Sequence, residues 1–253
     1  PARHPAGLLC EILPEDGDMA RMPRLREIAA EHDLQIITIA DLLRWRRQNE
    51  KLVVRQAEVP LPTAHGEFQM IAYSTNIDAA THVALVKGDV TEGPPVVVRV
   101  HSECMTGDVL GSLRCDCSPQ LAAAQRRVAE EAARGGSGVV VYLRGHEGRG
   151  IGLANKIRAY GLQDRGLDTV DANLQQGLPV DAREYDVAAA ILRDLGVTVV
   201  RLLTNNPRKV DGLRRNGIAV EQTVGLIADV TPESARYLDT KRDRLGHSFP
   251  VTR

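Results

Sequence analysis

The strongest constraint on the fold is a regular alternation of strand-like and helix-like segments from Pro95 onwards. Val96–His101 consists mainly of valine, which is typical of a buried strand, and the apolar residues at 121, 124, 128 and 132 then recur at helical spacing. Further strands are expected at Val139–Leu143, Val197–Leu203 and Ile218–Val224, and further helices at Leu153–Tyr160, Tyr185–Leu195 and Pro207–Asn216. Strands that alternate with helices indicate a layered α/β domain built on a sheet.

A β-rich part precedes this alternation. Two runs with alternating polar and apolar residues, Phe68–Ser74 and His82–Lys87, flank the turn-forming segment 76–78. The expected fold class is therefore α/β, a layered domain with a mixed sheet and a β-rich N-terminal part.

Residues 1–47 differ from the rest and predict a short, incomplete α/β segment. Strands are expected at Leu8–Leu13 and Leu34–Ile39, a helix at Pro23–His32 and a helix end at Asp41–Arg47. The first apolar strand has no polar lead-in, so we expect this segment to be cut from a longer polypeptide. Residues 48–60 are predicted to be a linker, 61–230 the main domain and 231–253 a charged C-terminal tail.

Composition sets the broad class of protein. The 253 residues are 43% hydrophobic and 26% charged, which is typical of a soluble globular protein. The net charge of −1 predicts no general attraction to nucleic acid or membranes, and the aromatic content of 3% offers few platforms for stacked bases. Because no apolar run reaches the roughly 20 residues that cross a bilayer, we expect a cytoplasmic protein with no membrane partner.

Three cysteines are the sharpest local signal. Cys104, Cys115 and Cys117 lie shortly after His101, and thiolates from a strand end and the next loop can converge on one tetrahedral zinc ion. Three protein ligands leave a fourth position for a catalytic water. The spacing is equally compatible with a closed structural zinc site, in which His101 or Cys10 is the fourth ligand, and with unrelated core thiols.

A glycine-rich segment, Arg144–Leu153, follows an expected strand and opens a helix. Glycines let the backbone approach a ligand, and a helix N-terminus favours anions. Residues 144–166 contain five basic and two acidic residues, so the segment can bind phosphate; the alternative is a tight turn beside a solvated helix face. The spacing matches neither the dinucleotide-binding fingerprint nor a Walker A loop.

Two further segments can bind phosphate. Thr204–Lys209 also ends a strand and starts a helix, with Asn206 as its expected N-cap, and would lie at the same sheet edge as the glycine-rich segment. Asp181 and Arg183 either begin a helix or form a pair in which the acid orients the arginine towards a phosphate. Spacing leaves both alternatives open. Together with the cysteines, these segments favour hydrolysis of a nucleotide.

Several runs of this sequence are similar to those of a known family. They are residues 99–108 and 112–117, which include the three cysteines, and Glu147–Leu153, Lys156–Tyr160 and Arg201–Pro207. In all of them the chain resembles GTP cyclohydrolase II, and the resemblance covers about Leu61 to Ile227.

The resemblance implies roles for individual residues. Cys104, Cys115 and Cys117 correspond to the ligands of one zinc ion per subunit, and Tyr160 to a tyrosine implicated in completing ring opening. The residues that correspond to GTP contacts are Arg99, Val100, His101, Ser102, Glu103, Gln120, Glu147, Gly148, Arg149, Thr169, Thr204 and Lys209. Asp181 corresponds to the proposed proton acceptor and Arg183 to the proposed nucleophile, although a protonated guanidinium is better suited to stabilising charge.

Members of this family hydrolyse GTP to 2,5-diamino-6-(5-phosphoribosylamino)pyrimidin-4-one, formate and pyrophosphate, the first committed step towards riboflavin. They use magnesium with the triphosphate as well as zinc, and they are typically homodimers. The resemblance therefore implies a zinc-dependent hydrolase with GTP as its small-molecule substrate. The alternatives are a related GTP hydrolase that retains the formyl group, against which Tyr160 argues, and a nucleotide-binding module with a structural zinc.

Residues 1–47 resemble the C-terminal end of 3,4-dihydroxy-2-butanone-4-phosphate synthase, through the segments 5–11 and 16–21. Glu11 matches one of the active-site acids of that enzyme. The acidic loop and the histidine that hold its magnesium are absent from this sequence, so we expect no synthase activity.

Overall fold

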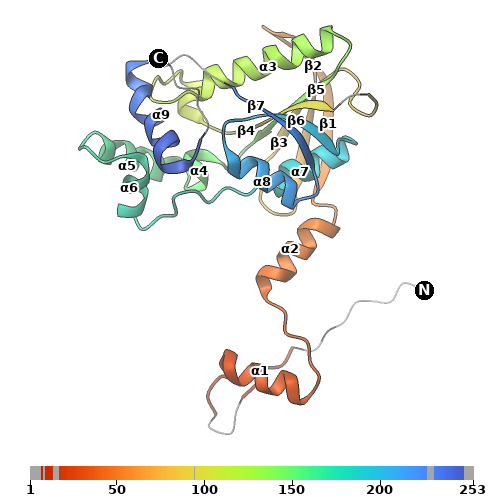
Figure 1. Cartoon of the computed structure of the whole chain (residues 1–253), viewed down its shortest axis with the longest axis vertical. Coiled ribbons are helices and arrows are strands. Elements are labelled where there is room, and N and C mark those ends of the chain that lie inside the picture. The colour runs from red at the N-terminus through yellow and green to blue at the C-terminus, as the bar shows by residue number, and fades with distance from the viewer. Residues whose placement is uncertain (1–6, 8, 14–16, 94, 227–230, 248–253) are drawn as a thin grey trace. The chain divides into compact units, whose positions relative to one another are not determined.

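The computed structural model describes residues 7, 9–13, 17–93, 95–226 and 231–247. It consists of two compact units, Pro1–Arg46 and Arg47–Arg253, and each is described by itself (Figure 1).

The first unit is helical where it is regular. Its helix α1 (Met22–Glu31) is the one expected at Pro23–His32, and α2 (Ile39–Asn49) covers the expected helix end. The strand prediction at Leu34–Ile39 is wrong, because residues 34–38 are irregular and α2 begins at Ile39. Residues 9–13 are irregular too, and Leu8 lies outside the described residues. A strand is stable only when it is paired, and the described part of this unit contains no strand with which either segment could pair.

The second unit is built on one seven-stranded sheet. Its strands are β1 (Val53–Thr63), β2 (Gly66–Thr75), β3 (His82–Lys87), β4 (Val96–Ser102), β5 (Gly138–Leu143), β6 (Val199–Leu203) and β7 (Ala219–Val224), in the spatial order β1-β2-β3-β5-β4-β6-β7. β1, β2, β3 and β5 pair antiparallel, whereas β5, β4, β6 and β7 pair parallel. The mixed sheet with its β-rich start confirms the expected α/β fold class.

Strand β1 occupies residues that we expected in the linker at 48–60. It pairs with β2 from Val53, opposite Thr75, to Thr63, opposite Gly66. The prolines at positions 60 and 62 argued against a strand in the sequence, because proline lacks the N–H group that a central strand needs. β1 is an edge strand with β2 as its neighbour, and an edge strand tolerates both prolines.

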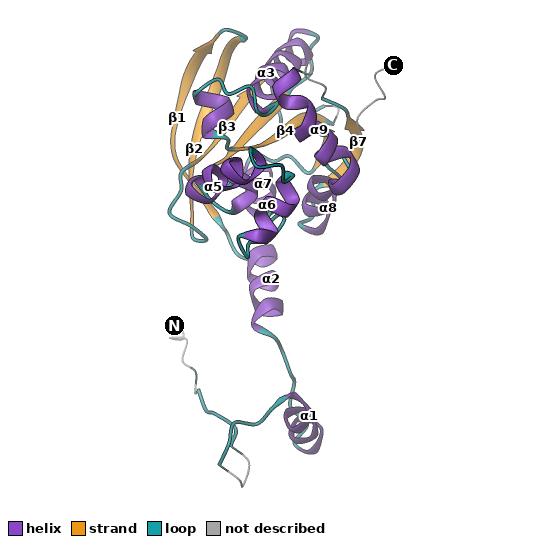
Figure 2. Cartoon of the chain, turned by 90° about the vertical axis from the view of Figure 1, so that its left-hand side faces the viewer, coloured by secondary structure: helices purple, strands orange, loops and turns teal. Residues whose placement is uncertain are grey.

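Helices cover both faces of the sheet. They are α3 (Cys117–Ala133), α4 (Glu147–Gly150), α5 (Leu153–Gln163), α6 (Thr169–Gln175), α7 (Asp186–Asp194), α8 (Pro207–Arg215) and α9 (Pro232–Leu245). On one face Val128 of α3 packs with Val140 of β5, and on the other Ile191 of α7 packs with Val139, so successive residues of β5 serve two cores. Figure 2 shows β1, β2 and β3 at one end of the sheet and β7 at the other. Within the described ranges, no helix combines the length and the apolar character needed to cross a membrane.

The parallel strands β5, β4 and β6 end at one edge of the sheet. Ser102 in β4 lies opposite Leu143 in β5, and Val98 lies opposite Leu202 in β6. The loops that follow these strands start at residues 103, 144 and 204. This confirms that the glycine-rich segment and the Thr204 segment share one sheet edge, with the cysteine loop between them.

Two helical glycines allow a matched test of the packing around α8. A Cβ added to Gly212 in α8 would lie 2.6 Å from Tyr185 Cδ2, whereas one added to Gly161 in α5 meets no surrounding atom within 4 Å. Alanine stabilises an open helix position by about 0.5–1 kcal/mol. We therefore expect Gly161→Ala to raise the free energy of unfolding, and Gly212→Ala to lower it by about 1–3 kcal/mol. Urea unfolding of both variants measures the difference, and equal stabilisation by both would contradict this packing of Tyr185.

Candidate active site

The three cysteines converge although 12 residues lie between the first and the last. Cys104 follows β4, Cys115 lies in the loop before α3, and Cys117 is the first residue of α3. Their Sγ atoms all lie within 4.8 Å of one another, and Cys104 Sγ is 3.7 Å from Cys115 Sγ. Tetrahedral zinc with Zn–S bonds of about 2.3 Å places two sulfurs about 3.8 Å apart, whereas a disulfide requires about 2.05 Å. The donor set and its spacing therefore fit a zinc ion.

The cluster leaves a coordination position without a protein ligand. Among the described residues, no further His, Cys, Asp or Glu joins the three cysteines. His101, the expected alternative ligand, directs Nε2 at the Asp108 carboxylate at 3.1 Å. Asp108 also accepts hydrogen bonds from the Tyr142 hydroxyl and from the Cys104 backbone N–H. His101 and Asp108 thus support the cysteine loop rather than closing the site.

Gly107 makes room for the thiols. It lies in a short π-helical turn, Met105–Val109, and its N–H donates to Cys104 Sγ at 3.4 Å. A Cβ on this residue would lie 2.9 Å from Cys115 Sγ and 3.2 Å from Cys104 Sγ. Any larger side chain would therefore displace the sulfurs, so the glycine is required by close approach.

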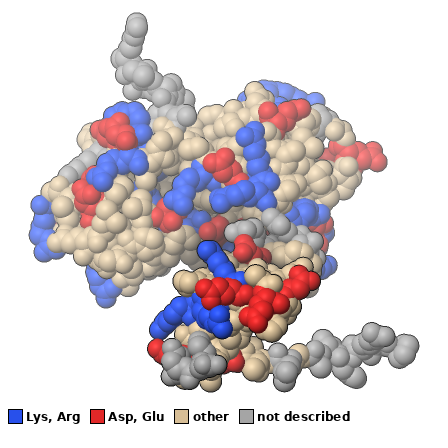
Figure 3. Space-filling view, turned by 60° about the horizontal axis from the view of Figure 1, so that its bottom comes forward, with Lys and Arg blue, Asp and Glu red and all other residues tan. Residues whose placement is uncertain are grey.

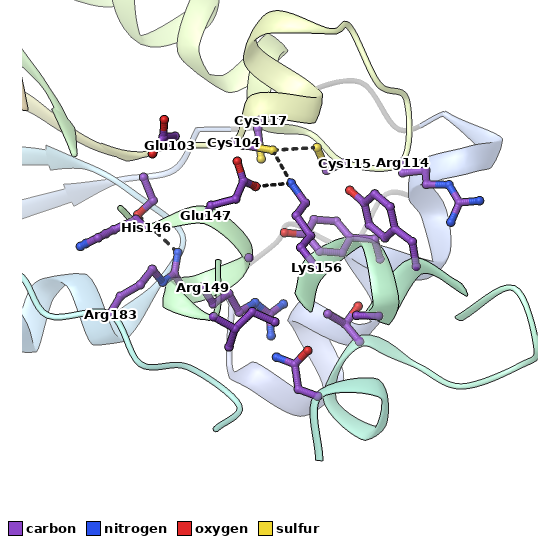
Figure 4. Close-up of a pocket in the computed structure, with 18 of the residues that line it drawn as sticks. Glu103, Cys104, Arg114, Cys115, Cys117, His146, Glu147, Arg149, Lys156 and Arg183 are labelled. Carbon is purple, nitrogen blue, oxygen red and sulfur yellow. Dashed lines mark hydrogen bonds and ion pairs between the residues drawn. The ribbon is translucent and has the colours of Figure 1, made fainter. Parts of the chain in front are cut away.

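Lys156 binds the cysteine cluster from α5 (Figure 4). Its Nζ donates to Cys104 Sγ at 3.1 Å, to Glu147 Oε1 at 2.6 Å and to Thr106 Oγ1 at 2.8 Å. Burial lowers the pKa of Lys156, but the Glu147 hydrogen bond and the Cys104 charge outweigh burial and raise this pKa above its usual value. Hydrogen bonds from Cys115 and Cys117, with Lys156, in turn lower the pKa of Cys104, so a thiolate faces an ammonium.

A cavity of about 620 Å³ opens beside the cysteines, and we call it the metal lobe. Its lining includes the three cysteines, Lys156 and Tyr160. The Tyr160 hydroxyl lies 3.3 Å from Thr106 Oγ1, and the Arg114 guanidinium lies 4.9 Å from the centre of the Tyr160 ring. Burial raises the pKa of Tyr160, so its hydroxyl stays a hydrogen-bond donor at neutral pH.

The glycine-rich segment is strained at Arg149. Gly148 and Arg149 have φ values of 60° and 65°, in the left-handed region that non-glycine residues rarely adopt. Arg149 O accepts a hydrogen bond from Ala182 N at 3.0 Å, which helps to hold this conformation. Both terminal nitrogens of Arg149 are buried without a hydrogen-bond partner. A strained backbone that presents an unpaired guanidinium is typical of a ligand-binding position.

A second cavity, of about 530 Å³, adjoins the first, and we call it the cationic lobe. The basic residues that line it are Arg99, Arg149, Arg183, Lys209 and Lys241, and no Asp or Glu is among its described lining residues. Lys209 Nζ donates to a neutral acceptor, Val100 O, at 2.7 Å. Burial and then the charges of Arg99, Arg183 and Lys241 lower the pKa of Lys209 far below its usual value. Buried cations without counter-charges are unfavourable until an anion binds, so the lobe suits a polyphosphate.

These cations do not form a surface patch. On the face shown in Figure 3, basic and acidic side chains are interspersed. Arg99 and Lys209 are buried. The candidate anion site is therefore an internal feature.

Asp181 and Arg183 form a bidentate pair. Arg183 Nε and one terminal nitrogen donate to the two Asp181 oxygens at 2.9 and 2.7 Å. The other terminal nitrogen lies 3.4 Å from Ser102 Oγ, which in turn contacts His146 Nδ1 at 3.1 Å. Burial opposes the charge of Arg183, but Tyr185 and Asp181 outweigh it and raise the pKa of Arg183. Burial and the charges of Arg183 and Lys209 lower the pKa of His146 to about 3, so His146 is neutral.

The structure brings most of the expected site residues to these two lobes. The metal lobe is lined by Ser102, Glu103, Glu147, Gly148, Arg149, Tyr160, Thr169 and Arg183, and the cationic lobe by Arg99, His101, Ser102, Gln120, Arg149, Arg183, Thr204 and Lys209. Val100 lines neither lobe because its side chain is buried in the sheet core. Asp181 lines neither lobe and contacts Arg183, which lines both. Both carboxylate oxygens of Glu147 already accept hydrogen bonds within the protein, one from Met105 N and one from Lys156 Nζ.

Sequence reasoning gave no role to several residues of these walls. His146 lies in the glycine-rich segment and Lys156 in a run that resembles the family, and their contacts in the structure rather than their spacing in the sequence reveal what they touch. Tyr237 and Lys241 come from α9, within the expected tail. A signal for this helix was present: Thr231 is followed by Pro232 and, three residues on, by Ser234, and the structure shows a capping box there.

Comparisons with known proteins agree with this geometry. The sequence profile of GTP cyclohydrolase II matches residues 54–225, and that of 3,4-dihydroxy-2-butanone 4-phosphate synthase matches residues 2–45. The riboflavin biosynthesis protein RibBA of Salinispora arenicola is 58% identical over 243 residues, 96% of this chain and 57% of that protein. The bifunctional riboflavin biosynthesis protein RIBA 1, chloroplastic, of Arabidopsis thaliana is 53% identical over 245 residues, 97% of this chain and 44% of that protein.

The chain spans about half the length of the curated relatives it matches. A crystal structure of RibBX, a two-domain 3,4-dihydroxy-2-butanone 4-phosphate synthase from A. baumannii, is 31% identical and covers 87% of this chain and 53% of its own, with a TM-score of 0.45. The assignment therefore rests on the sequence profile, which matches more than half of the chain, and on the closely similar relatives. On both grounds, the chain belongs to the GTP cyclohydrolase II family.

Proposed function

We propose that this chain catalyses the zinc-dependent hydrolysis of GTP to 2,5-diamino-6-(5-phosphoribosylamino)pyrimidin-4-one, formate and pyrophosphate, the first committed step of riboflavin biosynthesis. The observation that carries the proposal is the junction of the two lobes, since Cys117, Arg149 and Arg183 line both. A guanine ring beside the cysteines would leave its triphosphate among the buried cations. Magnesium with the triphosphate and a homodimer complete the proposal and rest on family resemblance. The cytoplasmic location expected from the sequence, which has no apolar run long enough to cross a membrane, is part of the proposal too.

The metal lobe supplies the groups for ring opening. Zinc held by the three cysteines, one ion per subunit, would supply Lewis acidity that makes water nucleophilic near neutral pH. Lys156 fixes Cys104 and Glu147 beside this position. Tyr160 lines this lobe and stays protonated, so it would donate a hydrogen bond to the ring as it opens.

Arg183 stabilises charge at the α-phosphate in this proposal. Its raised pKa keeps the guanidinium protonated, and a protonated guanidinium has no lone pair for nucleophilic attack. Asp181 fixes the orientation of Arg183 through two hydrogen bonds. Water is then the nucleophile that releases pyrophosphate, and Arg183 binds the negative charge that develops on the phosphate oxygens.

The first test is formate release from GTP with magnesium. Zinc removal should abolish formate release and zinc addition should restore it, because the fourth coordination position is where water is activated. Cys115→Ser should lose bound zinc and at least about 100-fold of the formate rate, whereas Cys10→Ser, at an exposed cysteine of the first unit, should change neither. Metal analysis and quantitation of formate and pyrophosphate measure both.

The products distinguish the alternatives. Pyrophosphate without formate in the zinc-loaded protein would identify a GTP hydrolase that retains the formyl group. Bound zinc and bound GTP with neither product would identify a nucleotide-binding module and defeat the catalytic proposal.

Replacement of Arg183 tests its role at the phosphate. Arg183→Lys keeps a charge but loses the bidentate contact, so we expect pyrophosphate release to fall about 100–1,000-fold with KM little changed. Arg208 lies 3.4 Å from the same Asp181 carboxylate but is 53% exposed, so Arg208→Lys should cost less than about tenfold. No nucleotide should remain on alkali-quenched wild-type protein that has turned over α-labelled GTP. Stoichiometric labelling would instead establish a covalent role for Arg183.

The neutral state of His146 predicts a pH dependence of stability. Its pKa is about 3 in the folded protein and about 6.5 when unfolded, so below pH 6.5 the unfolded state binds the extra proton. This contribution is lost as the pH falls from 6.5 towards 3 and amounts to about 2 kcal/mol between pH 7 and pH 5. His146→Asn should weaken the pH dependence in urea unfolding by that amount. His32→Asn, at an exposed site, should not, and the same pH dependence in all three proteins would refute a neutral, partly buried His146.

A further inference from the structure

Helix α9 lies beyond the residues that the family profile matches, yet it lines both lobes. The profile ends at residue 225, and α9 spans Pro232–Leu245. Tyr237 lines the metal lobe and the cationic lobe, and Lys241 lines the cationic lobe. The Arg149 guanidinium, which has buried unpartnered nitrogens, lies 6.0 Å from the centre of the Tyr237 ring. α9 thus covers a cation whose two terminal nitrogens have no hydrogen-bond partner in the protein.

Lys241 connects α9 to the cysteine loop. Its Nζ donates to Asp116 Oδ1 at 2.5 Å, and only 10% of the Lys241 side chain and 2% of the Asp116 side chain are exposed. Asp116 lies between Cys115 and Cys117 in the sequence. Removing one partner of a buried pair leaves an unpaired charge, so such a pair fixes its two segments relative to each other.

The same carboxylate is linked to Arg99, a cation that lines the cationic lobe. Gln120 Nε2 donates to Asp116 Oδ2 at 2.5 Å, and Arg99 donates to Gln120 Oε1 at 2.6 Å. Three consecutive hydrogen bonds therefore join Lys241 to Arg99. Movement of α9 would therefore shift both the cysteine loop and Arg99 in the cationic lobe.

Arg244 attaches α9 to a second wall of the site. It donates to Asp168 at 2.5 Å and to Asp171 at 3.1 Å, next to and within α6. Thr169, at the start of α6, is an expected GTP contact and lines the metal lobe. Lys241 therefore attaches α9 at the cationic lobe, and Arg244 attaches it beside the metal lobe.

We propose that α9 is part of the nucleotide site, where it closes the cationic lobe over the polyphosphate of the substrate and where Lys241 is a positioning residue that holds Asp116 and Arg99. The proposal rests on the proposed function for the identity of the nucleotide. The polyphosphate chemistry follows from the lobe itself, whose five cations include Lys241.

The test compares Lys241→Met with Arg242→Met in the full chain. Arg242 is the next residue of α9, its side chain is 51% exposed, and its ion pairs are with Asp239 and Asp243 on the same helix. Calorimetry measures the binding of GTP, inorganic tripolyphosphate and guanosine, and steady-state kinetics measures KM and kcat. Metal analysis checks zinc content.

We expect Lys241→Met to weaken GTP and tripolyphosphate binding at least tenfold and to raise KM by a similar factor. Guanosine binding should stay within twofold, since guanosine has no phosphate to contact the cationic lobe. Lys241→Arg should recover most of the loss, and Arg242→Met should match the wild type. Hydrogen exchange should show that amides of residues 232–245 gain protection when tripolyphosphate binds.

Unchanged tripolyphosphate affinity in Lys241→Met would overturn the proposal. So would equal weakening of guanosine binding, which would reveal general damage to the fold, or α9 amides that gain no protection. These readouts are independent of turnover. A wild-type protein that binds tripolyphosphate through Lys241 but releases no formate would therefore defeat the proposed function and leave this inference standing.

Discussion

The site depends on the parallel pairing of β5, β4 and β6. Parallel strands end at the same edge of a sheet, so the pairing of Ser102 with Leu143 brings the cysteine loop beside the glycine-rich loop. The pairing of Val98 with Leu202 does the same for the Thr204 loop. Parallel strands must be covered on both faces, and α3 and α7 provide that cover. The antiparallel strands β1, β2 and β3 extend the sheet sideways from β5, and none of the residues that line the two lobes lies on them.

The fold places charge at this edge at some cost to its own stability. Asp181 neutralises Arg183 and Asp116 neutralises Lys241, but Arg99 and Lys209 donate to neutral acceptors. Burying such groups without counter-charges is unfavourable. Fold stability does not explain these unpaired buried cations. Binding of an anionic ligand does, because the anion would provide the missing counter-charge. Functional sites are where a structure departs from its own stability rules.

The sequence predicted the parts of the structure that are local. Strand and helix alternation predicted β4 to β7 and the helices α3, α5, α7 and α8, and the cysteine spacing predicted the thiol cluster that Cys104 completes. Strand β1 was missed because Pro60 is acceptable only on an edge strand, and pairing order cannot be read from composition. Val100 lies in a run that resembles the family and was expected to contact GTP. Its position in β4 directs its side chain into the hydrophobic core instead. Lys241 was missed because its partner is 125 residues away.

The balance of charge around the thiols explains why Lys156 lies among them. In the proposed zinc site, three thiolates would outnumber the charge of the divalent ion, and strong donation from sulfur would weaken the Lewis acidity that the proposed ring opening needs. The hydrogen bond from Lys156 to Cys104 draws electron density from that sulfur, and its bond to Glu147 keeps the ammonium in place. Partners of metal ligands tune a site in this way as much as the ligands do. Glu147 also accepts a hydrogen bond from Met105 N, so this one carboxylate fixes both Lys156 and the cysteine loop.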